Sequence, residues 1–167
     1  MQPPLSPARL LPCEPLSAAD LAAVLAGART LLDSAGAGPS RDALRGKKIG
    51  MLCETDDAPD AVLFRGAALE LGAHVAHLRP SLSALSTPQE VQDTARMLGR
   101  LYDAVECQGM APGLVRQMGT DAGVPVYDGL ASALHSTARL AEQLEGDGAT
   151  ADKRRIVLQA MLLATIT

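Results

Sequence analysis

The chain has 167 residues, which is enough for one hydrophobic core but not for two large domains. Hydrophobic residues make up 47% of the sequence and aromatic residues only 2%, so Ala, Leu, Val and Met must fill the core, which favours helix-rich α/β layers over an all-β fold. The net charge of −4 argues against a nucleic-acid or anionic-membrane partner, because such partners bind clustered Lys and Arg.

The elements are predicted in chain order from proline content, capping residues and apolar spacing. Residues 1–15 are rich in proline and predict an extended arm. Ser17 and Asp20 form an approximate capping box, which predicts a helix from there to about Ser34. Short apolar runs then alternate with helical patterns. Strands are expected at 49–53, 75–78, 104–107 and 124–127, and helices at 58–71, 89–102, 112–121, 130–144 and 152–166.

This alternation predicts a three-layer α/β fold, in which an open parallel four-stranded sheet is flanked by helices on both faces. Residues 16–167, including the C-terminal helix 152–166, are expected to form a single domain. A ligand in such a sheet lies beyond the carboxyl ends of the strands. The candidate positions therefore follow Cys53, Cys107 and Tyr127.

Cysteine content and hydropathy bear on location and cofactors. Three widely spaced cysteines, Cys13, Cys53 and Cys107, favour reduced thiols over a disulfide framework or a zinc site. No apolar run is long enough to cross a bilayer, and residues 1–17 lack the layout of a signal peptide. We therefore expect a cytoplasmic protein without a membrane contact, a metal or another cofactor.

Three motifs carry a resemblance to a known family. Residues 93–103 read D-T-A-R-M-L-G-R-L-Y-D and are similar, almost residue for residue, to the D-T-A-R-V-L-G-R-M-Y-D helix of ornithine carbamoyltransferases. Residues 44–47 resemble that family's L-x-G-K lead into its first strand, and residues 124–130 resemble its V-P-V-x-N-G-L segment. The resemblance covers residues 16–144 and implies the fold of the carbamoyl-phosphate-binding, N-terminal domain of aspartate/ornithine carbamoyltransferases.

The end of the chain resembles a distant part of the same family. Residues 152–162 are similar to the family's C-terminal helix, which returns to the first domain after the chain has built an amino-acid-binding domain. Here residues 145–151 alone connect that helix to the one before it. We interpret the sequence as a carbamoyltransferase without its second domain, lost where the two ends of that domain lie close together.

The resemblance also implies that the phosphate-binding residues have been replaced. Family members hold carbamoyl phosphate with an S-T-R-T-R loop, in which backbone N–H groups, the helix dipole and arginines attract phosphate. The aligned residues of this sequence lack both arginines and all hydroxyls: Asp57, Ala58, Pro59, Asp60 and Ala61. Pro59 removes a backbone donor, and the aspartates bring negative charge to this position.

Other positions change in the same direction. The family's Y-R-G after the third strand is C-Q-G here, with Gln108 in place of the arginine. The H-P-T-Q motif is H-S-T-A, so the histidine and threonine remain and the glutamine is absent. Ala84 lies in the loop that sends a polar side chain into the neighbouring subunit's site in the family, and it offers none. The resulting degenerate pocket has no catalytic residue and consists of Glu54, Asp57, Ala58, Pro59, Asp60, Ala61, Gln108, His135, Thr137 and Ala138.

Several of these residues have a structural interpretation beside the functional one. The acidic turn 54–60 could bind a cation or an amine, or Asp57 could act as an N-cap with Pro59 and Asp60 in the first helical turn. His135 could contact a ligand or pack against its neighbours. Cys53 and Cys107 are interpreted as small apolar filler.

Three functions follow from these observations. The first is a non-catalytic ornithine carbamoyltransferase-like protein that binds another subunit or a small ligand. The second is a transferase component completed by a full-length carbamoyltransferase, and the third is a small-molecule sensor that uses the acidic pocket. The resemblance further implies a homotrimer and a place in amino acid metabolism. A pocket filled by side chains would exclude the sensor.

Overall fold

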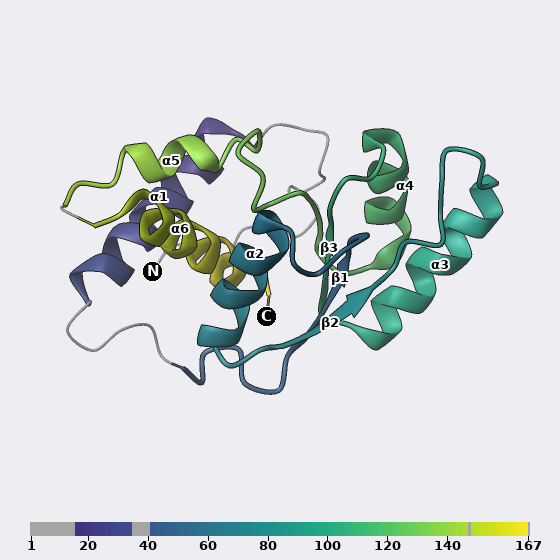
Figure 1. Ribbon diagram of the computed structural model, residues 1–167, viewed down its shortest axis with the longest axis horizontal. Helices are drawn as coiled ribbons and strands as arrows, with labels where there is room; N and C mark the ends of the chain where they lie inside the picture. The colour runs from purple at the N-terminus through teal and green to yellow at the C-terminus, as the bar shows by residue number, and fades with distance from the viewer. Residues whose placement is uncertain (1–15, 35–40, 147, 167) are drawn as a thin grey trace.

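The computed structural model describes residues 16–34, 41–146 and 148–166 (Figure 1). The predicted arm at 1–15, with Cys13, lies outside the described residues. Four parallel strands form one sheet in the order β2-β1-β3-β4. Their bounds are β1 Lys48–Leu52, β2 His74–Leu78, β3 Ala104–Cys107 and β4 Val126–Asp128. The helices are α1 Ala18–Asp33, α2 Pro59–Glu70, α3 Pro88–Leu101, α4 Pro112–Ala122, α5 Ala138–Glu142 and α6 Thr150–Thr165.

Helices cover the two faces of the sheet unequally, and the predicted three-layer α/β fold is confirmed. Helices α3 and α4 lie together on one side, while α1, α5 and α6 group on the other with α2 (Figure 1). A hydrophobic core lies on each face of the sheet, and β3 contributes side chains to both because successive side chains of a strand point to opposite faces. Val105 and Cys107 belong to the core under α3 and α4, and Ala104 belongs to the larger core under α1, α2, α5 and α6.

The motif at residues 93–103 holds α3 against the sheet and against α4. The Asp103 carboxylate accepts a hydrogen bond from the Lys48 backbone N–H at 2.8 Å, at the start of β1. The Tyr102 ring lies so close to Gly50 that a methyl group there would be 3.1 Å from it. A methyl group on Gly99 would lie 1.8 Å from the carbonyl oxygen of Ala122 in α4. The motif that carries the family resemblance is therefore a packing motif.

The N-terminal caps of α1 and α2 differ. The Ser17 hydroxyl accepts a hydrogen bond from the Asp20 N–H at 3.1 Å and donates to the Asp20 carboxylate at 2.7 Å, as the sequence predicts. The prediction of Asp57 as the N-cap of α2 is wrong, because Ala58 holds that position without a side-chain cap bond. Pro59 is the first helical residue, where its fixed φ is favourable, so the cap falls on the residue before it.

The region after β4 departs most from the sequence prediction. One helix was expected over 130–144, but only α5 is helical and the residues before it form turns. The Ser132 hydroxyl accepts from the Leu134 N–H at 3.2 Å, and the His135 ring accepts from the Thr137 N–H at 3.2 Å. Such local side-chain bonds compete with the helical pattern and explain the difference.

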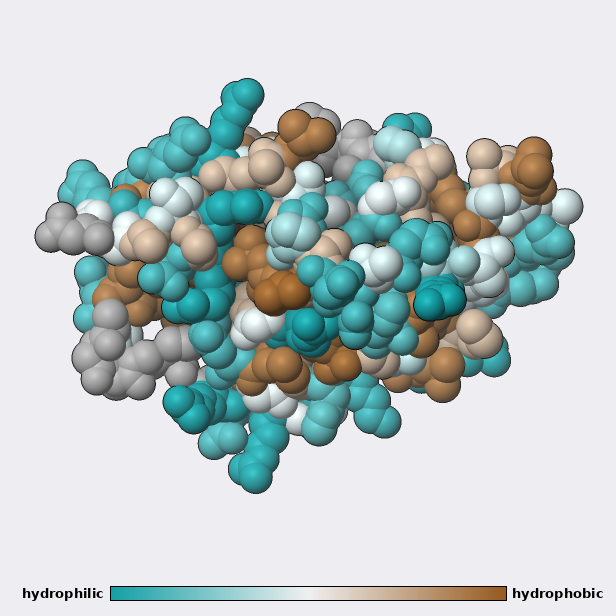
Figure 2. All heavy atoms as spheres, in the orientation of Figure 1, coloured by the Kyte–Doolittle hydropathy of each residue, from teal (hydrophilic) through white to brown (hydrophobic). Residues whose placement is uncertain are grey.

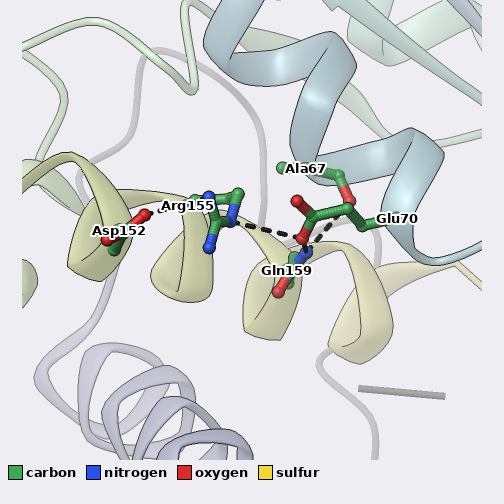
Figure 3. Close-up of polar contacts among 5 residues, drawn as sticks. All are labelled: Ala67, Glu70, Asp152, Arg155 and Gln159. Atoms are coloured by element: carbon green, nitrogen blue, oxygen red, sulfur yellow. Dashed lines mark hydrogen bonds and ion pairs between the residues drawn. The ribbon is translucent and has the colours of Figure 1, made fainter. Parts of the chain in front are cut away.

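Helix α6 is buried on most sides and packs against α1, α2 and α5. All residues from 157 to 162 are buried, in one core with Val24 and Leu25 of α1. Its polar residues join it to α2: the Gln159 amide donates to the Ala67 carbonyl at 3.3 Å and to the Glu70 carboxylate at 2.8 Å (Figure 3). Arg155 forms an ion pair with Glu70 at 3.2 Å. No helix within the described ranges is long and apolar enough to span a bilayer.

Candidate functional site

An open cavity of about 470 Å³ lies at the carboxyl ends of β1 and β3. Its walls come from the turn after β1, the start of α2, the loop after β2, the turn after β3 and the start of α4. This is the position at which a parallel α/β sheet binds its ligands. Because the cavity is open, the condition that would exclude a small-molecule site is not met.

The polar lining of the cavity is acidic. Glu54 lies in the turn after β1, and Asp60 lies in the first turn of α2. Within the part of the chain that the structure describes, no Arg, Lys or His lines the cavity. Arg65, further along α2, instead contacts Asp56: its guanidinium donates to the Asp56 carbonyl at 3.0 Å and lies 3.9 Å from the Asp56 carboxylate. The lining therefore favours a cation or a neutral group over an anion.

The cysteines at the strand ends are free and buried. Burial, followed by the negative charge of Asp56, raises the pKa of the Cys53 thiol, which lines the cavity. Burial also raises the pKa of Cys107. A thiol with a raised pKa stays protonated at neutral pH and is a poor nucleophile. Neither of the two described thiols is thus activated for covalent chemistry.

The remaining walls are an amide and apolar side chains. The Gln108 side chain lines the cavity, and its Nε2 atom is buried without a hydrogen-bond partner in the described part of the chain. Leu82, Met110 and Leu114 form the apolar wall, from the loop after β2, the turn after β3 and α4. A few polar groups within an apolar lining are typical of small-molecule sites.

The structure brings together half of the residues predicted for the degenerate pocket. The five that line the cavity are Glu54, Ala58, Pro59, Asp60 and Gln108. Asp57 belongs to the same turn but is exposed and does not line the cavity, and Ala61 is fully buried on the core-facing side of α2.

The remaining predicted residues, in the turns after β4 and at the start of α5, do not line the cavity. Thr137 and Ala138 border a much smaller hollow beside α6. The His135 ring hydrogen-bonds the Thr137 hydroxyl at 2.9 Å, and burial lowers the pKa of His135 to about 4. A histidine that is neutral and bonded within its own turn has the features of a packing residue.

Glu106 is a buried acid that the sequence interpretation missed. It is fully buried in β3, where its Oε1 accepts from the Leu130 N–H at 3.0 Å and its Oε2 has no hydrogen-bond partner among the described residues. Burial raises its pKa to about 8, against the opposing effects of the Leu130 hydrogen bond and the nearby Gln108 amide, which does not reach full hydrogen-bond geometry. A glutamate inside a four-residue apolar strand was the signal that could have identified it.

The histidines on β2 have no part in the cavity. His74 and His77 are exposed on this edge strand, and the His77 Nε2 lies 2.8 Å from the carbonyl oxygen of Cys53. Across the described ranges, no three His, Cys, Asp or Glu side chains group closely enough to hold a metal ion.

Comparison with known proteins identifies the family. The model of the family described as "Aspartate/ornithine carbamoyltransferase, carbamoyl-P binding domain" matches residues 9–145. The chain belongs to this family. The ornithine carbamoyltransferase of Actinobacillus pleuropneumoniae serotype 5b is 38% identical over 108 residues, which cover 65% of this chain and 32% of that protein. That of Cutibacterium acnes is 38% identical over 107 residues, which cover 64% of this chain and 32% of that protein.

Solved structures agree with this carbamoyltransferase assignment. The ornithine carbamoyltransferase of Pyrococcus furiosus superposes with a TM-score of 0.68 and 27% identity, over 84% of this chain and 45% of that one. The enzyme of Gloeobacter violaceus gives a TM-score of 0.55 and 29% identity, over 74% of this chain and 39% of that one. This chain therefore spans about a third of the length of the curated relatives it matches. The resemblance drawn from the three motifs is confirmed.

Proposed function

We propose that this chain is a non-catalytic member of the carbamoyltransferase family that acts by binding a small ligand in its open cavity or by joining another subunit. The observation that carries the proposal is the lining of the cavity, which contains Glu54 and Asp60 and, among the described residues, no basic side chain. The resemblance places the relatives' phosphate-binding loop at this turn. A cavity with acids in place of arginines repels a dianion such as carbamoyl phosphate.

The magnitude of the lost attraction supports this proposal. One arginine about 4 Å from a phosphate charge contributes on the order of 4 kcal/mol at an effective dielectric of roughly 20, before desolvation. The aligned turn lacks both arginines, and Pro59 at the first position of α2 has no N–H to donate to a phosphate. Even a fraction of the loss, together with repulsion from Asp60, leaves no useful affinity.

Calorimetry and an activity assay test the proposal together. Carbamoyl phosphate is expected to bind with a dissociation constant weaker than about 1 mM, which corresponds to a binding free energy near −4 kcal/mol. No citrulline is expected from carbamoyl phosphate and ornithine. A tighter constant, or citrulline formation above the rate without protein, would contradict the proposal.

Subunit association is the other part of the proposal. A homotrimer is inferred from the family resemblance, and closed cyclic assemblies are common among homo-oligomers. Hydrophobic side chains gather over α2 in the centre of the face in Figure 2. Two large hydrophobic residues of α2 are exposed: Val62 to 49% and Leu69 to 52%. Replacing both by serine is expected to weaken association, whereas Leu134→Ser, at a position 96% exposed in a loop, is the matched control. Light scattering of the unaltered chain that reports a monomer at all micromolar concentrations would refute the trimer.

A transferase component completed by a full-length relative is the second candidate. It is supported by the match of residues 9–145 to the family's carbamoyl-P binding domain. Co-expression with a full-length ornithine carbamoyltransferase tests it through co-purification and a gain in citrulline formation over that enzyme alone. A cytoplasmic location belongs to the same proposal and is supported by the free thiols of Cys53 and Cys107.

A further inference from the structure

A buried acid and a cavity-lining amide meet at the end of β3. The Gln108 N–H continues the strand pairing by donating to the Leu52 carbonyl at 2.9 Å, so Glu106 and Gln108, two residues apart, lie on the same face. Glu106 is fully buried, and the Gln108 amide is the side-chain donor that lowers its pKa. Gln108 is only partly buried and lines the cavity. The pair therefore connects the core with the cavity wall.

Each residue of this pair has one buried atom without a hydrogen-bond partner. Oε1 of Glu106 accepts from the Leu130 N–H at 3.0 Å, whereas its Oε2 has no partner among the described residues. The Gln108 Nε2 is also buried and unpaired within the same part of the chain. Because the amide nitrogen is closed off, the carbonyl oxygen is the polar atom that Gln108 offers to the cavity.

The surroundings of Glu106 favour its neutral form. The titratable groups that face it are two thiols, a phenol and a carboxylate: Cys53, Cys107, Tyr127 and Asp128. Arg154 of α6 reaches the adjoining turn, where its guanidinium donates to the Ala131 carbonyl. A buried carboxylate that is not paired with a cation is costly. Burial accordingly raises the pKa of Glu106 to about 8.

The proton on Glu106 decides which atom of the Gln108 amide can pair with it. Since Oε1 accepts the Leu130 N–H, the proton of the neutral acid is carried by Oε2, which then donates. A donating Oε2 pairs with the amide oxygen, whereas an ionised Oε2 pairs with the amide nitrogen. Half a turn about the last torsion of Gln108 exchanges these two atoms, and rotation about this torsion is not confined to staggered positions.

We propose that the protonation state of Glu106 sets which end of the Gln108 amide faces the cavity, so that the wall presents a donor when Glu106 is neutral and an acceptor when it is ionised. The two facing atoms without partners, Oε2 and Nε2, carry this inference. Ligands that accept from Gln108 are then favoured at neutral pH, and ligands that donate to it are favoured at alkaline pH. That consequence rests on the proposed function, because it requires a ligand in the cavity.

NMR of the Gln108 side-chain amide in the full chain, from pH 6.5 to pH 9, tests this switch without a ligand. Its N–H resonances should move with a midpoint near pH 8, because the amide gains a carboxylate acceptor as Glu106 ionises. Exchange of these protons with water should slow relative to the Glu106→Gln variant at the same pH. One pH unit above the midpoint, the expected reduction is about tenfold, since only about a tenth of Glu106 is still protonated.

Three variants assign the titration. Glu106→Gln keeps the shape and places a permanent donor at the Oε2 position, so the Gln108 amide should give the low-pH spectrum of the unaltered chain at every pH. Asp128→Asn removes a negative charge that raises the Glu106 pKa, so the midpoint should move to lower pH. Cys53→Ala is the matched control. It removes a neighbouring thiol whose own pKa is raised, and the midpoint should not move.

The outcomes separate this switch from the proposed function. Gln108 resonances that do not titrate between pH 6.5 and pH 9, or that titrate equally in Glu106→Gln, would overturn the switch. If the unaltered chain unfolds above pH 8, or Glu106→Gln does not fold, the lower midpoint of Asp128→Asn decides the question, and an unchanged midpoint there would also overturn the switch. Calorimetry with carbamoyl phosphate tests the proposed function independently, because its result does not depend on how the Gln108 amide titrates.

Discussion

Helix α3 and the turn between β1 and α2 both align with segments of the family, but α3 resembles its family motif closely and the turn does not. In α3 the family motif is present because its residues leave no space for alternatives: Gly99 contacts the Ala122 carbonyl, and Tyr102 packs against Gly50. In the turn after β1, Glu54 and Asp57 face solvent and bear no such contacts. We therefore propose that this turn has changed its chemistry while the fold that carries it has stayed the same.

The largest effect is expected from removing α6. This deletion tests whether the fold depends on the last helix of the described chain. In a chain ending at Gly148, the core loses Val157, Leu158, Met161 and Leu162, all buried. Four such side chains contribute roughly 6 to 12 kcal/mol at about 1.5 to 3 kcal/mol each, comparable with the net stability of a domain. We expect aggregation or loss of the cooperative melting transition by circular dichroism.

A shortened chain that remains folded, with the same melting temperature and oligomeric state, would contradict the proposal that residues 16–167 form one folding unit. It would also make the packing of α6 against α1 dispensable.

The next largest effect on stability concerns Glu106, which lies in the core although it is an acid. Its folded-state pKa of about 8 lies above the ordinary value of 4.5, so the folded protein holds a proton that the unfolded chain has released. This stabilisation is complete below pH 4.5 and is lost as pH rises towards 8, with a slope approaching about 1.4 kcal/mol per pH unit. Glu106→Gln should remove this slope and stabilise the protein at pH 8 by roughly 3 to 5 kcal/mol relative to the unaltered chain.

Urea unfolding between pH 6.5 and pH 8 measures this slope without interference from His135. The pKa of that histidine is lowered from 6.5 to about 4, so its stabilisation is lost only as pH falls below 6.5. Glu142→Gln, on the exposed side of α5, is the control and should keep the slope of the unaltered chain. Equal slopes for Glu106→Gln and the unaltered chain would mean that Glu106 ionises normally.

A smaller effect on stability is expected from replacing helical glycines by alanine, which distinguishes the cost of tight packing from the gain in helix propensity. Gly99→Ala places a methyl group where the Ala122 carbonyl lies 1.8 Å away, so α3 and α4 must move apart. Overpacking of this kind costs about 1 to 3 kcal/mol. Gly66→Ala, within α2, adds a methyl group that meets no described atom of another element within 4 Å and should instead stabilise the protein by up to about 1 kcal/mol. Thermal unfolding measures both changes in stability. If the two variants change the melting temperature equally, the close contact between Gly99 and the Ala122 carbonyl does not matter for stability.

The smallest effect is expected at the pocket. Asp60 lies in the first turn of α2, where its charge favours the helix dipole by about 0.3 to 1 kcal/mol. Asp60→Asn should reduce stability by no more than this amount in urea unfolding. A loss of stability as large as that of Gly99→Ala would mean that Asp60 supports the fold. The contrast between the core packing and the pocket would then no longer hold.

The sequence was most informative where packing and backbone geometry decide the structure. Apolar runs such as residues 49–53 predicted the strands because a buried parallel strand is apolar on both faces. The prediction of a helix over 130–144 was wrong for residues 130–137. The Ser132 and His135 side chains accept hydrogen bonds from nearby backbone N–H groups, and apolar spacing does not reveal such bonds.

The site was less predictable, because it depends on which side chains meet in space. Glu54 and Gln108 follow different strands and were expected at the same sheet edge, where the structure places both. Thr137 and Ala138 were expected in the same pocket, but the turns after β4 direct them towards α6. The apolar wall of Leu82, Met110 and Leu114 was missed, because single apolar residues in loops carry no periodic signal.

The central claim is that the family frame is intact while its cavity has lost the preference for phosphate. Backbone amide NMR spectra of the unaltered chain, recorded with increasing carbamoyl phosphate up to 10 mM, test this most directly. We predict no saturable shifts at Glu54, Asp60, Gln108 and Leu114, which line the cavity, in a spectrum whose dispersion shows a folded protein. Saturable shifts confined to these amides, with a dissociation constant below about 1 mM, would contradict the account.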